Sequence, residues 1–271
     1  MIVDTFPLEY EREVLLIRLR ELRGVVGKHV IIEAPETFSG NQRALFWPTI
    51  CDEPEFREFR RKIDYRVIGF TATEPWMREQ EMRDATLTWG RAACEKPSDL
   101  ILLGDVDEIP TRQAVAEAAV MGSRSRKSWK LRLPTRYHQL RLNLRAAGSP
   151  GHLWEFRQPV IAPFRVMMTT TGVDIRAESG RLAEPQMSPG EPLLGWHFSC
   201  QGSAEQVRRK LSAGAHTEWA WLTEAHVARR ISEREELCRR DKLIVVTPEE
   251  MPDAVNEDPD RFAHLMLGGQ E

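Results

Sequence analysis

The sequence predicts an α/β protein, with a mostly parallel sheet flanked by helices and a β-rich insertion in its second half. Two observations predict this fold class and its extent as one domain. Short apolar, β-branched runs alternate with helical patterns over the first 120 residues, and such runs are typical of parallel strands that are covered on both faces. The chain has 271 residues, 41% of them hydrophobic, which is enough for one large domain with its own core. We therefore expect a single domain over residues 1–271.

The first half begins with a strand at residues 1–5. Leu15, Leu19 and Leu22 then recur at the spacing of one buried helical stripe, and Gly24 is placed to end that helix. The further elements expected in this half are a strand at 29–32, a helix near 54–62, a strand at 65–70, a helix from 76 to about 94, and a strand at 100–103.

Beyond residue 125 the alternation gives way to shorter extended runs. Strands are expected at 129–133 and 137–144, with more extended chain at 153–162. Residues 177–195 are rich in Pro and Gly and predict a long loop. Ser203 followed by Gln206 predicts a capping box at the start of a helix over 203–211, and another helix is expected over roughly 219–239.

The net charge of −3 excludes a uniformly basic nucleic-acid-binding protein, although it leaves room for a local basic surface. Residues 118–154 contain no acidic residue. We expect this segment to be a solvated surface whose charges pair with acidic helices, and the alternative is contact with an anionic acceptor such as nucleic acid. Its eight basic residues are Arg124, Arg126, Lys127, Lys130, Arg132, Arg136, Arg141 and Arg145.

The cysteine pattern and hydropathy predict a cytoplasmic protein. The 4 cysteines lack the paired spacing of zinc or redox sites. No apolar run reaches the roughly 18–20 residues of a membrane span, and the N-terminus lacks a signal region. The excess of Arg over Lys, 31 to 7, indicates a GC-rich genome and hence a bacterial or phage source.

The strongest local signal is the acidic motif Asp105-Val106-Asp107-Glu108, directly after the strand at 100–103. Ligands of open α/β sheets bind beyond the carboxyl ends of strands. Two carboxylates one residue apart are typical of a Mg²⁺ or Mn²⁺ site that leaves positions for phosphate oxygens. One alternative is a capped strand end. Another is a phosphohydrolase nucleophile, for which Thr or Val is usual where Ile109 stands.

Several ordered motifs resemble those of glycosyltransferase family 17, the family of the enzyme that adds the bisecting N-acetylglucosamine to N-glycans. The resemblance spans most of the chain and is poor only over about 122–190. One departure is Tyr10, where the family usually has Asn. The similar motifs are Asp4-Thr5-Phe6-Pro7 with Glu11, Val30-Ile31-Ile32-Glu33, Thr37-Phe38-Ser39-Gly40, Arg83, the acidic motif through Pro110, Gly195-Trp196-His197-Phe198-Ser199, Lys210-Leu211, Ala215-His216-Thr217-Glu218, and Phe262 with Leu265.

The resemblance implies a GT-A type nucleotide-sugar fold and a metal-dependent, inverting glycosyltransferase. Such an enzyme would move a sugar of the N-acetylglucosamine type from a UDP-sugar to an acceptor hydroxyl on a glycan, a protein or a nucleic acid. Residues 1–121 would form the nucleotide-sugar-binding half, and residues 122–271 the acceptor-side half with C-terminal helices. The alternatives are a metal-dependent phosphohydrolase or nucleotidyltransferase, and a catalytically inactive sugar-binding module.

The resemblance also implies roles for individual residues. Asp105 and Asp107 would hold Mn²⁺ or Mg²⁺, with His197 as a third ligand or, alternatively, as a core histidine. Glu218 is the predicted base for the acceptor hydroxyl, with His216 orienting it. The residues expected to contact the donor are Phe6, Pro7, Glu11, Glu33, Ser39, Gly40, Arg83, Asp105 and Val106.

Some of these roles have alternatives. Glu155 and Asp174 also remain candidates for the base. Arg83 has a solvated helix face as its alternative, and Ser39-Gly40 has a tight turn. For Glu33 the alternative is a hydrogen bond to the following loop, and for Glu218 it is the start of a surface helix. Aromatic side chains stack on sugar rings, although most tryptophans are core residues. The candidates for acceptor contact are Trp76, Trp129, Trp154, Trp196, Trp219 and Trp221.

Overall fold

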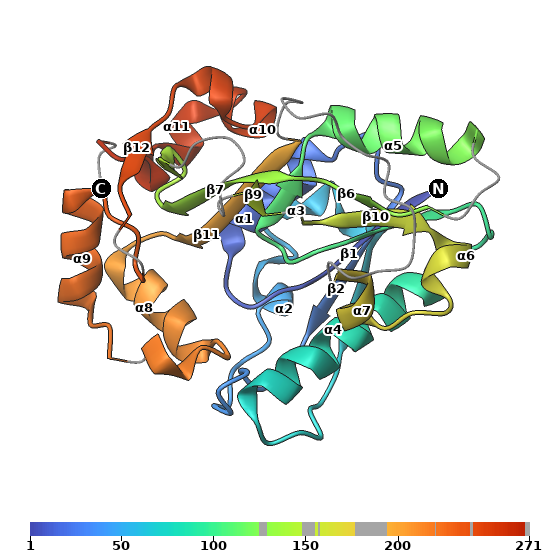
Figure 1. Cartoon of the computed structure of the whole chain (residues 1–271), viewed down its shortest axis with the longest axis horizontal. Coiled ribbons are helices and arrows are strands. Elements are labelled where there is room, and N and C mark those ends of the chain that lie inside the picture. Colours follow the sequence, from blue (N-terminus) through green and yellow to red (C-terminus); the bar gives the residue numbers. More distant parts are fainter. Residues whose placement is uncertain are drawn as a thin grey trace.

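In a computed structural model, the chain forms two mixed sheets surrounded by helices (Figure 1). The structure describes residues 1–124, 129–147, 155–156, 158–176, 194–219, 221–238 and 241–268. The strands are β1 (Ile2–Pro7), β2 (Lys28–Glu33), β3 (Ile63–Val67), β4 (Leu100–Leu103), β5 (Glu108–Pro110), β6 (Leu131–Arg132), β7 (Thr135–Leu140), β8 (Leu144–Ala146), β9 (Glu155–Phe156), β10 (Val160–Pro163), β11 (Gly195–Gln201) and β12 (Leu243–Val245).

The helices lie between and around these strands. The α-helices are α1 (Arg12–Glu21), α2 (Trp47–Ile50), α3 (Pro54–Arg57), α4 (Pro75–Ala92), α5 (Arg112–Arg124), α6 (Phe164–Met167), α7 (Gly172–Arg176), α8 (Ala204–Ala213), α9 (Glu224–Glu233), α10 (Asp253–Asn256) and α11 (Pro259–Phe262). Short 3₁₀ turns are η1 (Arg60–Lys62), η2 (Thr217–Trp219), η3 (Pro248–Glu250) and η4 (Ala263–Leu265). Within the described residues, no helix has the length and apolarity needed to cross a membrane.

The first sheet has the order β3-β2-β1-β4-β10-β6. β3, β2, β1 and β4 are parallel to one another, and β10 and β6 continue the sheet with antiparallel pairing. The α/β class is therefore confirmed, and the parallel part of the sheet comes from the alternating first half of the sequence. The carboxyl ends of β1 and β4 meet at one edge, which is where an α/β sheet binds its ligands.

Strand β4 shows why the apolar run at 100–103 is continuous. Ile101 and Leu103 pack in a cluster with Leu87 of α4, whereas Leu100 and Leu102 pack in a cluster with Val115 of α5. Alternate side chains of a strand point to opposite faces, so both faces of this strand must be apolar. The two helices accordingly cover opposite faces of the sheet (Figure 1).

The second sheet has the order β12-β8-β7-β11-β5, with β9 paired to β7. Strand β4 is followed by a turn at residues 104–107, called the acidic turn below, and β5 begins directly after it. One chain segment therefore joins the two sheets. Trp196 and Phe198 of β11 belong to the same buried cluster as Phe6 of β1 and Leu15 of α1. The two sheets are thus held in a fixed relation by a shared core.

Several element boundaries differ from those expected. The expected strand at 137–144 divides into β7 and β8, because Leu140 has a left-handed φ of 71° and turns the chain. The expected helix at 219–239 is confined to α9, since Thr223 caps its start and Arg234, with a φ of 51°, ends it. The helix expected near 54–62 divides into α3 and η1, the strand expected at 65–70 is β3, and α5 was not expected.

Other local expectations have clear outcomes. The capping box of Ser203 and Gln206 at the start of α8 is confirmed. Most of the loop expected at 177–195 lies outside the described residues. The expectation of a solvated surface is wrong for Lys130, Arg132 and Arg141, which are buried. The expected pairing with acidic groups holds elsewhere in that segment, since Arg136 and Arg145 both reach the carboxylate of Glu250.

Candidate active site

A cavity of about 260 Å³ lies at the carboxyl ends of β1 and β4. Strand β11, helices α4 and α8 and the turn around η2 contribute the rest of its wall. Several predicted site residues that are far apart in the chain line this cavity. The lining residues are Pro7, Glu9, Glu11, Phe38, Glu79, Met82, Arg83, Asp105, Val106, Asp107, His197, Ser199, Cys200, Lys210, Leu211, Gly214, Ala215, His216 and Trp219.

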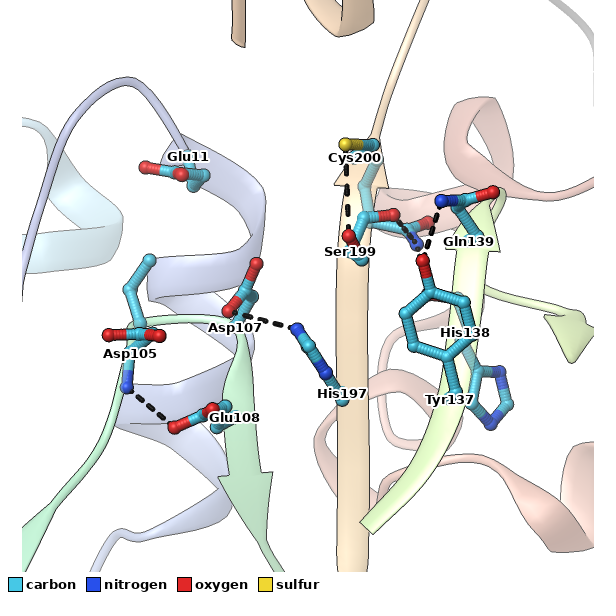
Figure 2. A network of polar contacts seen from close by, with 12 residues as sticks. Glu11, Asp105, Asp107, Glu108, Tyr137, His138, Gln139, His197, Ser199 and Cys200 are labelled. Carbon is cyan, nitrogen blue, oxygen red and sulfur yellow. Dashed lines mark hydrogen bonds and ion pairs between the residues drawn. The ribbon is translucent and has the colours of Figure 1, made fainter. Parts of the chain in front are cut away.

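The turn between β4 and β5 brings two carboxylates to this cavity. Asp105 is the more accessible, with 36% of its side chain exposed, whereas the side chain of Asp107 is 8% exposed. Oδ2 of Asp105 lies 3.0 Å from Arg176 Nη2, and Glu108 Oε2 accepts a hydrogen bond of 2.8 Å from the amide of Asp105 (Figure 2). The turn therefore presents one buried and one half-exposed carboxylate.

A buried arginine supports the backbone of this turn. Nη1 of Arg18, on α1, donates to the carbonyl oxygens of Asp105 at 2.9 Å and Glu108 at 2.8 Å. The same guanidinium binds both carboxylate oxygens of Asp4 at 2.6 and 3.0 Å, and His29 Nδ1 lies 2.9 Å from Asp4 Oδ2. Because Arg18, Asp4 and His29 are all buried, this network ties α1, β1 and β2 to the acidic turn.

Sequence reasoning missed Arg18, although the sequence carried a signal. It stands four residues from both Val14 and Leu22, so it occupies a position of the buried stripe of α1. A charged residue in such a stripe must find buried partners. Its partners could not be read from the sequence, because they lie 14 to 90 residues away.

Strand β11 places His197 beside the second aspartate. His197 is opposite Glu108 in the antiparallel ladder of β11 and β5, and the amide of Phe198 donates to the carbonyl of Asp107 at 2.8 Å. A Cβ at Gly195 would lie 2.3 Å from the carbonyl oxygen of Ile109, so glycine permits this close approach. As a result, His197 Nε2 lies 3.6 Å from Asp107 Oδ1 (Figure 2).

Lys210 on α8 binds the other oxygen of the same aspartate. Its Nζ lies 2.7 Å from Asp107 Oδ2 and 3.0 Å from Glu11 Oε1. Burial alone would raise the pKa of Asp107, but the ammonium of Lys210 and the nearby His197 outweigh it and hold that pKa below its usual value. Burial lowers the pKa of Lys210, but Asp107 and Glu11 together raise it well above its usual value. Asp107 is therefore an anion and Lys210 a cation at neutral pH.

The side chains in the cavity supply only part of the ligands that a divalent ion needs. Asp107 Oδ1 and His197 Nε2 are near enough to bind one ion together, and Asp105 lies in the same lining. In the described part of the chain, no group of three or more His, Cys, Asp or Glu side chains is arranged to hold a metal. An ion at this site would therefore take its remaining ligands from donor phosphates and water, as Mg²⁺ commonly does.

The residues predicted to contact the donor fall into two groups. Pro7, Glu11, Arg83, Asp105 and Val106 line the cavity. Arg83 also pairs with Glu79, one turn earlier on α4.

The other four predicted donor contacts lie outside the lining. Phe6 is in the core. Glu33 is buried and accepts hydrogen bonds from the amides of Phe46 at 2.7 Å and Trp47 at 2.6 Å. Ser39 Oγ donates to the carbonyl of Ser212, and Gly40 has a φ of 93°, which is typical of a turn glycine.

The predicted catalytic pair lies at the rim of the cavity. His216 lines it, and Glu218 does not. His216 Nδ1 lies 2.6 Å from Glu218 Oε1, and the hydrogen bond from His216 lowers the pKa of this exposed carboxylate. The ring of His216 stacks on Trp219 at a centroid distance of 4.2 Å and meets Trp76 edge-on at 4.6 Å.

The other tryptophan candidates lie elsewhere. Trp129 and Trp196 are buried, and Trp221 packs against His226. Trp154 lies outside the described residues. Trp219 itself lines the cavity, and Trp76 contacts the lining residue His216, so these two are the candidates at the rim.

The alternative bases do not strengthen the site. Asp174 is exposed on α7 and does not line the cavity. Glu155 belongs to β9, and its side chain lies outside the described part of the structure. Sequence reasoning missed a better placed carboxylate. Glu9 lines the cavity, and burial, together with the nearby charge of Glu11, raises its pKa to about 7. Nothing in the local sequence distinguishes Glu9 from a surface residue, because its environment comes from α8 and the acidic turn.

Residues 1–120 of the chain match the model of glycosyltransferase family 17. No match was found among curated proteins. The matched segment contains β1, β2, β3 and β4, the acidic turn and the buried arginine that supports it, and it supplies one wall of the cavity. Over these first 120 residues the chain is similar to glycosyltransferase family 17, and this match supports a glycosyltransferase enzyme.

Proposed function

We propose that this enzyme is a metal-dependent, inverting glycosyltransferase of GT-A type. In this proposal it moves a sugar of the N-acetylglucosamine type from a UDP-sugar to an acceptor hydroxyl. One observation carries the proposal: Asp105, Asp107 and His197 line a single cavity at the carboxyl ends of the parallel strands, in a chain similar to glycosyltransferase family 17 over its first 120 residues. The strand order β3-β2-β1-β4, with the acidic turn after β4, supports the GT-A type.

The donor is proposed to bind with its diphosphate near Asp107. Asp107 and His197 would hold Mn²⁺ or Mg²⁺, and Mn²⁺ is favoured because imidazole suits it better. When bound, such an ion stabilises the negative charge of the departing nucleoside diphosphate. Arg83 lines the same cavity as a cation and suits a phosphate oxygen. A cytoplasmic location and a bacterial or phage source stay predictions from composition.

The acceptor is proposed to approach over the rim at His216. Because Nδ1 of His216 is engaged by Glu218, Nε2 is the ring nitrogen left to take the proton of an acceptor hydroxyl. Glu218, the base expected from the sequence, does not line the cavity, so in this proposal the two roles are exchanged. Glu218 would orient the ring of His216 and balance the charge that the ring gains. Trp76 and Trp219, whose rings contact the ring of His216, offer aromatic surface at the rim, which suits a sugar ring and supports a glycan over a protein or nucleic-acid acceptor.

A screen of nucleotide sugars tests the proposed reaction. With Mn²⁺ present, release of UDP from a UDP-sugar is expected, either by transfer or by slow hydrolysis. Removal of the ion with EDTA is expected to lower the rate at least about 100-fold, since the charge on the leaving group then lacks its main partner. Restoring Mn²⁺ should restore the rate. UDP release that is insensitive to EDTA would show that the reaction needs no divalent ion.

The proposed base makes a separate prediction about transfer to the acceptor. His216→Asn should lower the rate of transfer about 100-fold, because the ring nitrogen that takes the proton of the acceptor hydroxyl is lost. Glu218→Gln should have a smaller effect, because it removes orientation and leaves the ring. Glu9→Gln is the matched comparison within the same cavity and should keep most of the rate. If Glu9→Gln loses the rate and His216→Asn keeps it, the base is Glu9.

A further inference from the structure

Lys210 reaches from α8 into the cavity and joins two carboxylates that come from distant segments. Its Nζ is 2.7 Å from Asp107 Oδ2 and 3.0 Å from Glu11 Oε1. The three side chains are 28%, 8% and 14% exposed, in the order Lys210, Asp107, Glu11. Water therefore screens these charges weakly. In the protein alone, the ammonium of Lys210 neutralises the carboxylate that is proposed to hold the metal.

Glu11 is itself held in place. Its Oε2 accepts hydrogen bonds from the amides of Glu9 at 3.1 Å and Tyr10 at 3.0 Å, which leaves Oε1 directed to Lys210. Asp107 in turn presents Oδ2 to Lys210 and Oδ1 to His197. A divalent ion that arrives at Asp107 and His197 thus meets a carboxylate whose charge is already balanced, beside a positive charge that repels the ion.

The second cation near the acidic turn is different in kind. Arg176 pairs with Asp105 and with both carboxylate oxygens of Glu108, and its side chain is 9% exposed. A planar guanidinium with such partners is fixed. Lys210 makes its two contacts through one nitrogen at the end of a flexible four-carbon stem. Lys210, unlike Arg176, can therefore change partners without rearranging the turn.

We propose that Lys210 is the resident counter-ion of this site and transfers from Asp107 to the donor diphosphate when nucleotide and metal bind. This inference rests on the proposed function, because it assumes that a nucleoside diphosphate enters the cavity. Two consequences follow. The ion alone binds weakly, since it must displace Lys210, and the diphosphate strengthens metal binding by giving the ammonium a new anionic partner.

The test measures binding rather than turnover. Mn²⁺ is titrated into the nucleotide-free protein, with the free ion followed by electron paramagnetic resonance, and UDP is titrated calorimetrically at saturating Mn²⁺. Lys210→Met is expected to bind Mn²⁺ alone about tenfold more tightly than the unmodified protein, and to bind UDP about tenfold more weakly. Arg209→Met is the matched control: this neighbouring exposed residue lies over the ring of Tyr10, and Mn²⁺ affinity should not change.

Lys210→Arg keeps the positive charge and covers the case in which Lys210→Met fails to fold. It should bind Mn²⁺ alone as weakly as the unmodified protein, and tighter binding would overturn the proposal. Unchanged or weaker Mn²⁺ binding by folded Lys210→Met would overturn it as well. If the unmodified protein binds no UDP at saturating Mn²⁺, the proposed function fails, whereas the Mn²⁺ titrations still decide whether Lys210 competes with the ion.

Discussion

Asp107→Asn is expected to lower UDP-sugar turnover about 100- to 1000-fold at saturating substrate and 1 to 10 mM Mn²⁺, roughly the cost of losing one key charge-stabilising group. Asparagine keeps the size of the side chain and removes the charge that attracts the ion. Because Asp107 is buried between His197 and Lys210, no other carboxylate of the turn can take over its position. The measurement is kcat as a function of Mn²⁺ concentration.

Asp258→Asn is the matched control for this variant. Asp258 belongs to the other Asp-x-Asp of the sequence and pairs with Arg20 at the surface, with 44% of its side chain exposed. Surface ion pairs contribute little to stability, so turnover should stay within about twofold of that of the unmodified protein. Thermal unfolding of both variants separates loss of chemistry from loss of fold. An Asp107→Asn variant that is folded and still active would show that Asp107 does not hold the catalytic ion.

The sequence predicted the position of the acidic turn because that inference depends only on local features. An apolar strand followed by two carboxylates places those carboxylates at the edge of the sheet, whatever the rest of the fold. The pairing of β5 with β11 could not be predicted in the same way, because it joins residues about 90 positions apart. His197 was proposed as a ligand from family resemblance alone, and the position of Lys210 was not anticipated.

Glu33 shows the opposite case. It ends a parallel strand, as Asp105 follows one, and a contact with the donor was expected for it, with a hydrogen bond to the following loop as the alternative. In the fold its oxygens are occupied by the amides of Phe46 and Trp47 and by the guanidinium of Arg43. Buried polar groups are almost always hydrogen-bonded, so a carboxylate at a strand end binds either a ligand or the following loop. Only the path of the following loop decides which.

Arg18 is expected to have the largest effect on stability. Arg18→Met should lower the free energy of unfolding by about 3–5 kcal/mol, because it removes the guanidinium that binds both carboxylate oxygens of buried Asp4 and leaves only His29 beside that charge. Burial raises the pKa of Asp4, but Arg18 and His29 outweigh it and lower that pKa below its usual value. The pair therefore stabilises the fold above the unfolded pKa of Asp4, and this contribution is lost as pH falls through the lower folded value. Denaturant unfolding at pH 7 measures the loss of stability, and unfolding measured from pH 4 down to about pH 2 measures its dependence on acid.

The double variant Arg18→Met with Asp4→Asn separates stability from function. Removing the buried charge together with its partner should recover about half or more of the lost stability, because an unpaired charge costs more than an absent pair. Turnover should not recover, since the carbonyl groups of Asp105 and Glu108 still lack the hydrogen bonds from Arg18 that fix the acidic turn. A stable double variant with full turnover and unchanged KM for the UDP-sugar would show that Arg18 holds only the fold. If stability returns while kcat stays low, Arg18 is a positioning residue of the active site, acting through the backbone that carries Asp105 and Asp107.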